Sequence, residues 1–551
     1  MVGASERSAA DIESGAVVTF IEAPGTVVLE NSQSKLKHGQ DGTLVLYPQP
    51  SEDPNDPLNW FYFRKIVNFS LVAFYVLMVF AFQDIPVIVF QDYVDQLGVT
   101  YGQLNNTFGL NCAGLALGCL MFIPFSIKYG RRPVYIVTTF VMFFTTIWQA
   151  RLRTYVSMMG VNLVMGLAGA VADTIVQMTI NDLFYLHQRG TMNAIYLIFV
   201  NVGVYLAPVA AGYSAQSQGW PWIYWWCTIF FGIVMVIFLF IYEETKYMVM
   251  SEGKEVPTSE VLIGEGEKGV QGNEKQPVEN ATAAHSTRQI DASIPLKSYR
   301  QRMTLITKTP GTFKDFLRHF YNPLLMLAIP GVAYTALQYG AFLSWISAVA
   351  TTESDFFSSD PYDFSTSGIG LLNLAPFIGA VVAAPYSGPL SDWSIIQLAK
   401  RNDGIYEPEM RLYLAIFPAL VGPAGLFLYG FALAHDAHWI APMAGVALYG
   451  FSQASIQALS LTYLMDSYEE ASNIPIFGVC FVRNAIAACI VFAVSPWIEG
   501  MGMYNTFVLL GCVALFVMLL CVPIIIWGKK LRILCKGRYA AYAKVQPARR
   551  G

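Results

Sequence analysis

Three ionisable side chains lie inside long apolar runs of this sequence, where a charge is expensive. Asp84 lies late in a run of about residues 66–90, Asp173 late in a run of about 155–180, and Arg483 near the middle of a run of about 474–497. A charge at the centre of a bilayer costs about 2.5–3.5 kcal/mol or more. Each of the three is therefore a candidate functional group, with a structural ion pair between helices as the alternative interpretation.

The chemistry open to these three groups differs. Burial disfavours the ionised form of a carboxyl group, so a buried aspartate can take up a proton and exchange it for a cationic ligand. Arginine does not release its proton in a protein, so Arg483 acts through structure or through its charge. Asp84 has no cation in its own run, which favours a functional role, whereas Asp173 can either pair with a neighbour or carry the proton.

The elements that must position these groups are membrane-spanning helices. Of the 551 residues, 55% are hydrophobic and only 13% are charged, against roughly 25% charged in soluble proteins. The apolar residues form twelve runs that are each long enough to cross a hydrocarbon core of about 30 Å. The runs cover about residues 66–90, 104–127, 133–150, 155–180, 190–214, 221–242, 323–349, 367–390, 411–433, 438–464, 474–497 and 503–527. We therefore predict an all-α membrane protein with twelve transmembrane helices in two six-helix halves.

The basic residues predict how this chain is oriented. With a cytoplasmic N-terminus, 31 of the 34 Lys and Arg residues fall on the cytoplasmic side, Arg151 and Arg153 fall outside, and Arg483 lies within a span. Cytoplasmic loops carry such an excess of positive charge. We expect a multi-pass protein of the plasma membrane, with both termini in the cytoplasm.

The polar segments predict the domain boundaries. Residues 1–55 read as a disordered N-terminal tail, 56–242 as the first half, 243–320 as a cytoplasmic linker, 321–530 as the second half and 531–551 as the C-terminal tail. The last part of the linker, about 297–320, combines apolar spacing with Arg300, Arg302 and Arg318, which predicts an amphipathic helix on the inner leaflet. The lipid bilayer accounts for the basic residues without a nucleic-acid surface.

Two loop signals suggest that a six-span unit is duplicated. Lys128–Pro133 follows the second run, with Gly130, Arg131 and Arg132 at its centre, and Gly388–Trp393 follows the eighth, with Gly388 and Asp392. Together they resemble the loop motif of the major facilitator superfamily, which reads Gly-x-Leu-x-Asp-x-x-Gly-Arg-Arg. The first copy departs from that motif, since Ile123 stands at the position of its first glycine and Ile127 at the position of its acid.

The fifth apolar run and four other stretches resemble one branch of the superfamily more specifically. Gly203-x-x-x-Ala207-Pro208-x-x-Ala211-Gly212 looks like the superfamily's antiporter motif, so we expect Gly203, Pro208 and Gly212 to set how this span bends and packs. Four further stretches resemble the fungal drug:proton antiporter branch, particularly its histidinol- and polyamine-type subgroup: Asp56–Trp60, Asp182–Gly190, Glu244–Tyr247 and Glu407–Leu412. In the fourth span, Asn162 stands where that family usually has an arginine associated with coupling.

The resemblance implies a central cavity lined by polar and aromatic residues of several spans. Gln453 and Gln457 are four residues apart and share a helix face. For each candidate, a hydrogen bond between helices is the alternative interpretation. The candidates are Asn111, Asn201, Tyr205, Tyr334, Gln338, Trp345, Asn373, Gln453 and Gln457.

The resemblance also implies a function: proton-coupled transport of a small organic compound by alternating access, with efflux as the expected direction. Proton-driven uptake of polyamine-like cations and a transporter-like nutrient receptor that does not transport remain alternatives. We expect a monomer whose partners are a small-molecule substrate, protons and lipid. No nucleotide-binding loop, catalytic triad or Cys/His cluster appears, so we predict no enzyme, no cofactor and no metal site.

Overall fold

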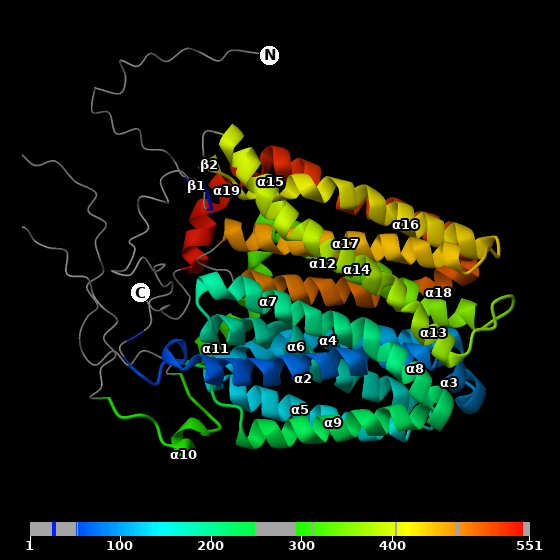
Figure 1. Ribbon diagram of the computed structural model, residues 1–551, viewed down its shortest axis with the longest axis horizontal. Coiled ribbons are helices and arrows are strands. Elements are labelled where there is room, and N and C mark those ends of the chain that lie inside the picture. Colours follow the sequence, from blue (N-terminus) through cyan, green and yellow to red (C-terminus); the bar gives the residue numbers. More distant parts are fainter. Residues whose placement is uncertain are drawn as a thin grey trace, which may run out of the picture.

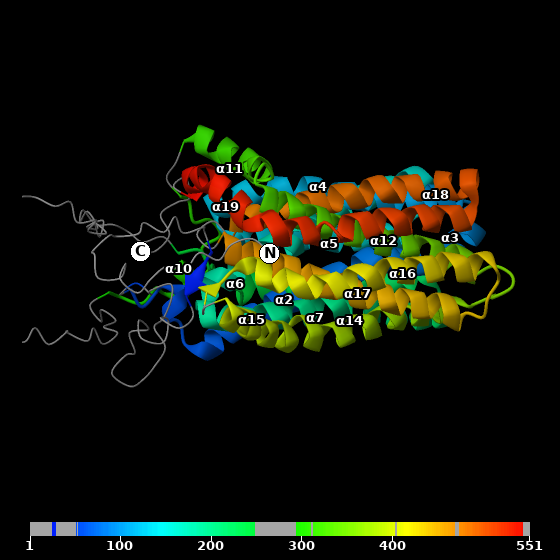
Figure 2. The ribbon, with the colours of Figure 1, turned by 90° about the horizontal axis from the view of Figure 1, so that it is seen from above.

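The computed structural model describes residues 25–28, 51, 53–247, 294–309, 312–402, 405–468 and 473–543 of the chain. The described part is a bundle of long helices that run side by side (Figures 1 and 2). The predicted disordered tail lies almost wholly outside the described residues, and so does most of the linker.

The first half contains six spans. The fifth span is interrupted by a π-helical turn, η3, between two α-helices. A short 3-10 helix, η2 (Pro57–Asn59), precedes the first span. The elements are α2 (Tyr62–Ile88), α3 (Phe90–Leu97), α4 (Tyr101–Tyr129), α5 (Arg131–Ala150), α6 (Tyr155–Leu183), α7 (Leu186–Asn201), η3 (Val202–Leu206), α8 (Ala207–Gln218) and α9 (Trp220–Phe240).

The second half is preceded by two short helices of the linker, α10 (Tyr299–Arg302) and α11 (Phe313–Met326). A two-residue strand pair, β1 (Val27–Val28) with β2 (Ile405–Tyr406), joins the N-terminal region to this half in antiparallel register, Val27 opposite Tyr406. The remaining elements are α12 (Pro330–Phe357), α13 (Thr366–Leu372), α14 (Leu374–Ser387), α15 (Pro389–Arg401), η4 (Pro408–Ala415), α16 (Ile416–Ala434), α17 (Ile440–Ser467), α18 (Asn473–Met518) and α19 (Cys521–Ala543).

The helix count agrees with the sequence. Among the described residues, nine helices are long and apolar enough to cross a membrane, and the bent pair of α11 and α12 makes ten. The stretch Pro475–Tyr539 counts once there, yet its backbone leaves the helical conformation at Gly502 (φ 82°, ψ 163°), which separates two spans. With α17, which is 28 residues long, the total is twelve. The predicted all-helical, two-half fold is confirmed.

The seventh span corrects one predicted boundary. The sequence predicts a span over 323–349, whereas α12 covers Pro330–Phe357. The start moves because the apolar residues before Pro330 belong to α11 and to the bend that follows it. The end moves because the polar residues 351–354 continue the helix as buried side chains.

Close contact between α4 and α6 in the first half depends on small residues. A Cβ atom added at Gly114 would lie 2.5 Å from the Leu163 carbonyl oxygen, and one at Gly118 would lie 2.4 Å from that of Leu167. The GxxxG pair of α4 therefore packs on α6 of the same chain. Each half has its own hydrophobic core, and a third cluster joins α4 and α6 to α12 and α18.

Candidate functional site

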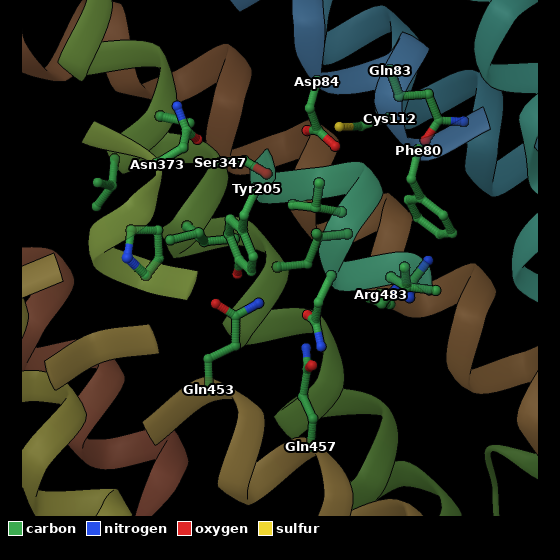
Figure 3. Close-up of a pocket in the computed structure, with 18 of the residues that line it drawn as sticks. Phe80, Gln83, Asp84, Cys112, Tyr205, Ser347, Asn373, Gln453, Gln457 and Arg483 are labelled. Carbon is green, nitrogen blue, oxygen red and sulfur yellow. The ribbon is translucent and has the colours of Figure 1, made fainter. Parts of the chain in front are cut away.

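A cavity of about 220 Å³ lies between the two halves. Its wall is formed by α2, α4, α6, α7 and η3 of the first half and by α12, α13, α14, α17 and α18 of the second. In Figure 3, Asp84 and Cys112 lie on one side of the cavity and Gln453 and Gln457 on the other, with Tyr205 between them. Most of the wall is apolar and a smaller number of polar groups is placed on it, as in sites that bind small molecules.

Six of the nine predicted polar and aromatic residues line this cavity. Two of them have buried oxygen atoms without a hydrogen-bond partner in the described structure, Asn111 Oδ1 and Gln453 Oε1. Such atoms are costly unless water or a ligand fills the cavity and bonds to them. The six residues are Asn111, Asn201, Tyr205, Asn373, Gln453 and Gln457.

The three predicted residues of the seventh span lie elsewhere. Tyr334, Gln338 and Trp345 share one face of α12, whereas the cavity is lined by the face that carries Tyr339 and Leu343. The Gln338 side-chain nitrogen donates to the Val517 carbonyl oxygen at 2.7 Å, and Trp345 borders a separate apolar pocket. The expectation that these three line the cavity is corrected, because the rotation of α12 turns Gln338 and Trp345 towards α18 and Tyr334 towards Tyr463 of α17.

Asp173 and Arg483 form an ion pair that crosses between the halves. Their side chains are 2% and 12% exposed, and both border the cavity. Asn484 completes the group: its side-chain nitrogen donates to Asp173 Oδ2 at 3.3 Å, and its Oδ1 accepts from Arg483 Nε at 3.2 Å. The Arg483 guanidinium also lies over the Tyr339 ring at 5.4 Å. The sequence leaves open whether these charges are functional groups or a structural ion pair between helices. In the structure, Asp173 and Arg483 are paired with each other.

Asp84 has a different environment. It lies on the cavity wall near the end of α2, and the described structure shows no hydrogen bond or ion pair to its carboxylate. The cation expected of a structural ion pair is thus absent around Asp84 in the described part of the chain. Its carboxylate faces the cavity, where a proton or a cationic ligand can reach it.

Sequence reasoning missed a second acid on the same wall, Glu353 of α12. Glu353 is 5% exposed and, like Asp84, has no hydrogen bond or ion pair among the described residues. Asp84 lies four residues before the end of α2 at Ile88, and Glu353 lies four before the end of α12 at Phe357, so the first span of each half carries an acid at the same depth. An alignment of the two halves would place Glu353 opposite Asp84. The predicted seventh span ends at 349, so Glu353 falls outside it and this correspondence is missed.

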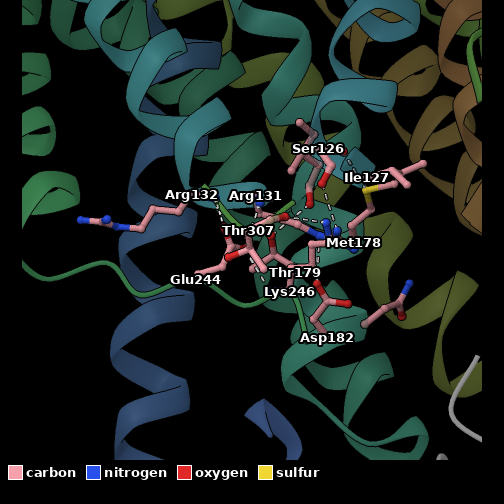
Figure 4. A network of polar contacts seen from close by, with 12 residues as sticks. Ser126, Ile127, Arg131, Arg132, Met178, Thr179, Asp182, Glu244, Lys246 and Thr307 are labelled. Carbon is pink, nitrogen blue, oxygen red and sulfur yellow. Dashed lines mark hydrogen bonds and ion pairs between the residues drawn. The ribbon is translucent and has the colours of Figure 1, made fainter. Parts of the chain in front are cut away.

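The loop motif of the first half forms a buried network at one end of the bundle (Figure 4). Arg131 pairs with Asp182 of α6 at 3.0 Å. Glu244 accepts hydrogen bonds from the backbone nitrogens of Arg131 and Arg132, at 2.9 and 3.1 Å. Burial raises the pKa of the Glu244 carboxyl, and these hydrogen bonds oppose the shift. Asp182 and Glu244 therefore surround the motif's arginines with acid, although Ile127 occupies the position of the motif's own acid.

Gly130 is required at this point of the network. Its backbone has φ 109°, a conformation that favours glycine, and a Cβ atom there would lie 2.2 Å from Glu244 Oε2. Next to it, Lys246 Nζ donates to the carbonyl oxygens of Lys128 and Thr307, at 3.1 and 3.0 Å. Burial, with the charge of Arg131, lowers the pKa of Lys246 to about 8. The network thus ties the linker to the loop after α4.

The second half has a corresponding network. Arg411, before the ninth span, pairs with Asp466 at the end of the tenth at 2.6 Å, as Arg131 pairs with Asp182 at the end of the fourth. Asp392 of the second loop motif also reaches Arg411, at 3.4 Å, from an exposed position. Gly388 begins α15. The repetition of an arginine–aspartate pair at equivalent positions supports the duplication that the loop signals suggest.

The span-five motif contacts the opposite half. A Cβ atom at Gly212 would lie 2.8 Å from the Thr366 carbonyl oxygen of α13, and the Pro208 carbonyl oxygen lies against Gly370. Gly203 approaches the Leu77 carbonyl oxygen of α2 in the same way, at 2.7 Å. The motif's small residues therefore allow α8 and α13, which belong to the fifth and eighth spans, to touch.

These features define a polytopic membrane transporter: two similar six-span halves, a cavity with polar and charged groups between them, and charged networks at one end. Residues 71–491 match the model of the Major Facilitator Superfamily, and the chain belongs to that family. It is 31% identical over 95% of both chains to an uncharacterized MFS-type transporter of Schizosaccharomyces pombe, and 28% identical to the protein HOL1 of Saccharomyces cerevisiae over 94% of this chain and 96% of that one.

Two further comparisons extend this result. The efflux pump radE of Floropilus chiversii is 24% identical over 87% of this chain and 83% of its own. Among solved structures, the human organic anion transporter MFSD10 (TETRAN) superposes with a TM-score of 0.51 at 13% identity, covering 83% of this chain and all of that one, which is a likeness of fold. The predicted resemblance to the superfamily is confirmed, and the protein is a membrane transporter of this type.

Proposed function

We propose that the protein couples the movement of protons to the export of a small organic compound that carries positive charge, as a member of the fungal drug:proton antiporter branch. The observation that carries this proposal is the pair of carboxyl groups in the central cavity, Asp84 and Glu353, for which the described residues supply no partner. Arg483 is already occupied by Asp173. The cavity therefore offers two acidic sites to ligands from outside the chain.

The chemistry of exchange follows from the cost of an isolated charge in a dry cavity. An ionised carboxylate there needs either a proton or a cation beside it. A proton that enters from the acidic side neutralises the carboxylate and releases a bound cation, and an entering cation expels the proton. When the cavity opens alternately to the two sides of the membrane, this competition links the two movements in opposite directions.

Uptake of polyamine-like cations is a second candidate, and the distribution of the two acids favours it. Asp84 belongs to the first half and Glu353 to the second, and both line the same cavity, so a ligand with two positive charges can contact one acid of each half. The same two carboxylates serve either direction of transport. In both cases we propose a plasma-membrane location with both termini in the cytoplasm, because basic residues gather on that side.

The test is transport into and out of proteoliposomes with an imposed pH gradient and a panel of monovalent and divalent organic cations. The variants are Asp84→Asn and Glu353→Gln, with Glu499→Gln as the matched control, since Glu499 is an exposed acid near the end of its span. Either cavity variant should fold as well as the parent and lose proton-driven transport by at least about tenfold, because neutralisation removes the binding charge. Asp84→Glu should keep part of the activity with a shifted pH optimum.

Two outcomes decide against the proposal. If both cavity variants are stable and transport normally across the pH range, the acids have no part in coupling. If the protein binds the cations but never moves them under any gradient, the receptor alternative replaces transport.

A further inference from the structure

We propose that α11 is a membrane-surface helix that binds the anionic lipid headgroups of the cytoplasmic leaflet. The assignment of the leaflet rests on the orientation given under the proposed function, whereas the lipid contact rests on the geometry and chemistry of the helix itself.

The direction of α11 is that of a helix lying along a membrane. It meets α12 at a bend of 84°. Because α12 crosses the bilayer, a helix nearly perpendicular to it runs along the membrane plane. Figure 2 shows α11 at the end of the bundle, inclined away from the long helices. Among the described residues, the bundle thus leaves one side of α11 free for lipid.

The free side of α11 is apolar. Phe313, Leu317 and Phe320 follow one another at helical spacing and are 66%, 46% and 42% exposed. Large side chains at this spacing, exposed to solvent, are characteristic of helices that insert one face among the lipid headgroups.

The charges beside that apolar face are positive. Lys314 and Arg318 are four residues apart, exposed, and next to the stripe. Residues 294–326 contain six basic residues and one acidic residue, Asp315. A membrane-surface helix with Lys and Arg beside its apolar face is complementary to anionic headgroups. A groove-binding protein partner would explain the apolar stripe but not the direction of α11 along the membrane.

The side of α11 next to this stripe, which carries Phe316 and Pro323, contacts both halves of the transporter. Phe316 packs edge-on against Phe125 of α4 at 5.3 Å, and the Lys128 ammonium lies 5.5 Å from the same ring. On the other half, the Pro323 carbonyl oxygen would lie 2.5 Å from a Cβ atom added at Gly478 of α18. A helix held by lipid at this place therefore touches both of the bodies that move during alternating access.

The experiment measures lipid contact directly in the full-length protein. Phe320→Trp places an indole on the exposed face, and Leu317→Trp is a second reporter in case the first disturbs folding. Each variant is placed in nanodiscs containing brominated phosphatidylcholine or brominated phosphatidylserine, and the quenching of the parent protein is subtracted. Lys314→Gln/Arg318→Gln is combined with each reporter, and Lys400→Gln/Arg401→Gln, an exposed basic pair of α15, is the matched control.

We expect both brominated lipids to quench the added indole, and the serine lipid to associate more strongly. Removal of Lys314 and Arg318 should lower the preference for phosphatidylserine by about fivefold for each charge removed, and the control pair should leave it unchanged. Absence of quenching by either lipid overturns the membrane contact and favours a protein partner. Equal quenching by the two lipids, or a preference that survives the double substitution, overturns the anionic site. Because the two leaflets of a nanodisc are identical and no transport is measured, failure here is distinct from failure of the proposed function.

Discussion

Each charge of the ion pair between Asp173 and Arg483 can be removed separately by substitution, and the cost to stability can be compared. In Asp173→Asn, the guanidinium stays in a site where it is 12% exposed, with Asn484 Oδ1 at 3.2 Å and the Tyr339 ring at 5.4 Å as its remaining contacts. Arginine remains protonated at every accessible pH, so the charge cannot be relieved. Breaking a buried pair in this way costs about 3–5 kcal/mol in the free energy of unfolding.

The reverse substitution behaves differently with pH. In Arg483→Gln, the carboxylate of Asp173 remains in a site where it is 2% exposed, but it can take up a proton. Its cost should therefore shrink as the pH falls, whereas the cost of Asp173→Asn should not depend on pH. The double variant leaves no lone charge, so it should recover most of the loss, since neutral replacements of a buried pair are often tolerated.

The assay is unfolding of the purified protein in mixed micelles titrated with sodium dodecyl sulfate, at pH 5 and pH 8. A double-mutant cycle should give a coupling energy of at least about 4 kcal/mol at pH 8, because two losses of about 3–5 kcal/mol each are replaced by a small residual loss in the double variant. The same cycle on Glu407 and Lys529, where the lysine is 53% exposed, should give less than about 1 kcal/mol. If the two single losses at Asp173 and Arg483 simply add, the two side chains do not stabilise each other and the reasoning fails.

Three more predictions address the packing and the two charged networks. Gly212→Leu should insert normally but lose transport, because its side chain would collide with the Thr366 carbonyl oxygen, 2.8 Å from the Cβ position; normal transport alongside normal surface expression would show that this contact is dispensable. The pKa of Lys246 is lowered to about 8, below the value of 10.5 for a free lysine, so the contact of Lys246 with the linker should tighten as the pH rises from 7 to 9. Hydrogen exchange should then show greater protection of residues 303–309 at the higher pH, and weaker protection would contradict the predicted direction. Glu409→Gln should cost about 3–5 kcal/mol, because Arg532 is 1% exposed and bonds to both carboxylate oxygens, at 2.8 and 2.6 Å; a change in melting temperature no larger than that of an exposed control would refute the estimate.

The spans and the halves could be predicted because the bilayer imposes one strong requirement on sequence, an apolar run of about 20 residues. The seventh span shows the limit of that rule. Residues 351–354 are polar but helical and buried against other helices, so hydropathy ends the span too early and Glu353 is missed. A polar residue can lie within a span when it faces a cavity or a neighbouring helix. Tertiary packing decides this, and local composition does not reveal it.

The sequence also does not determine how each helix is rotated about its own axis, and therefore which face meets the cavity. Polar and aromatic residues occur on two faces of α12, one with Tyr334 and Gln338 and the other with Tyr339. Residue type alone gives no choice between them. The partner of Asp173 is undetermined for the same reason, since Arg483 lies 310 positions away and meets it only through the packing of the two halves.

The π-helical turn at Val202–Leu206 has a consequence for the length of span five. A π turn arises when a helix absorbs one additional residue locally, so the segments on either side keep nearly their former rotation. Span five thus contains one residue more than a regular α-helix of the same length, in the turn where Tyr205 lines the cavity. We expect deletion of one residue inside this turn to leave α7 and α8 in register, whereas the same deletion within regular α6 would rotate everything after it by about 100°. Sequences in which this span is one residue shorter can therefore retain the same contact between Gly212 and Thr366.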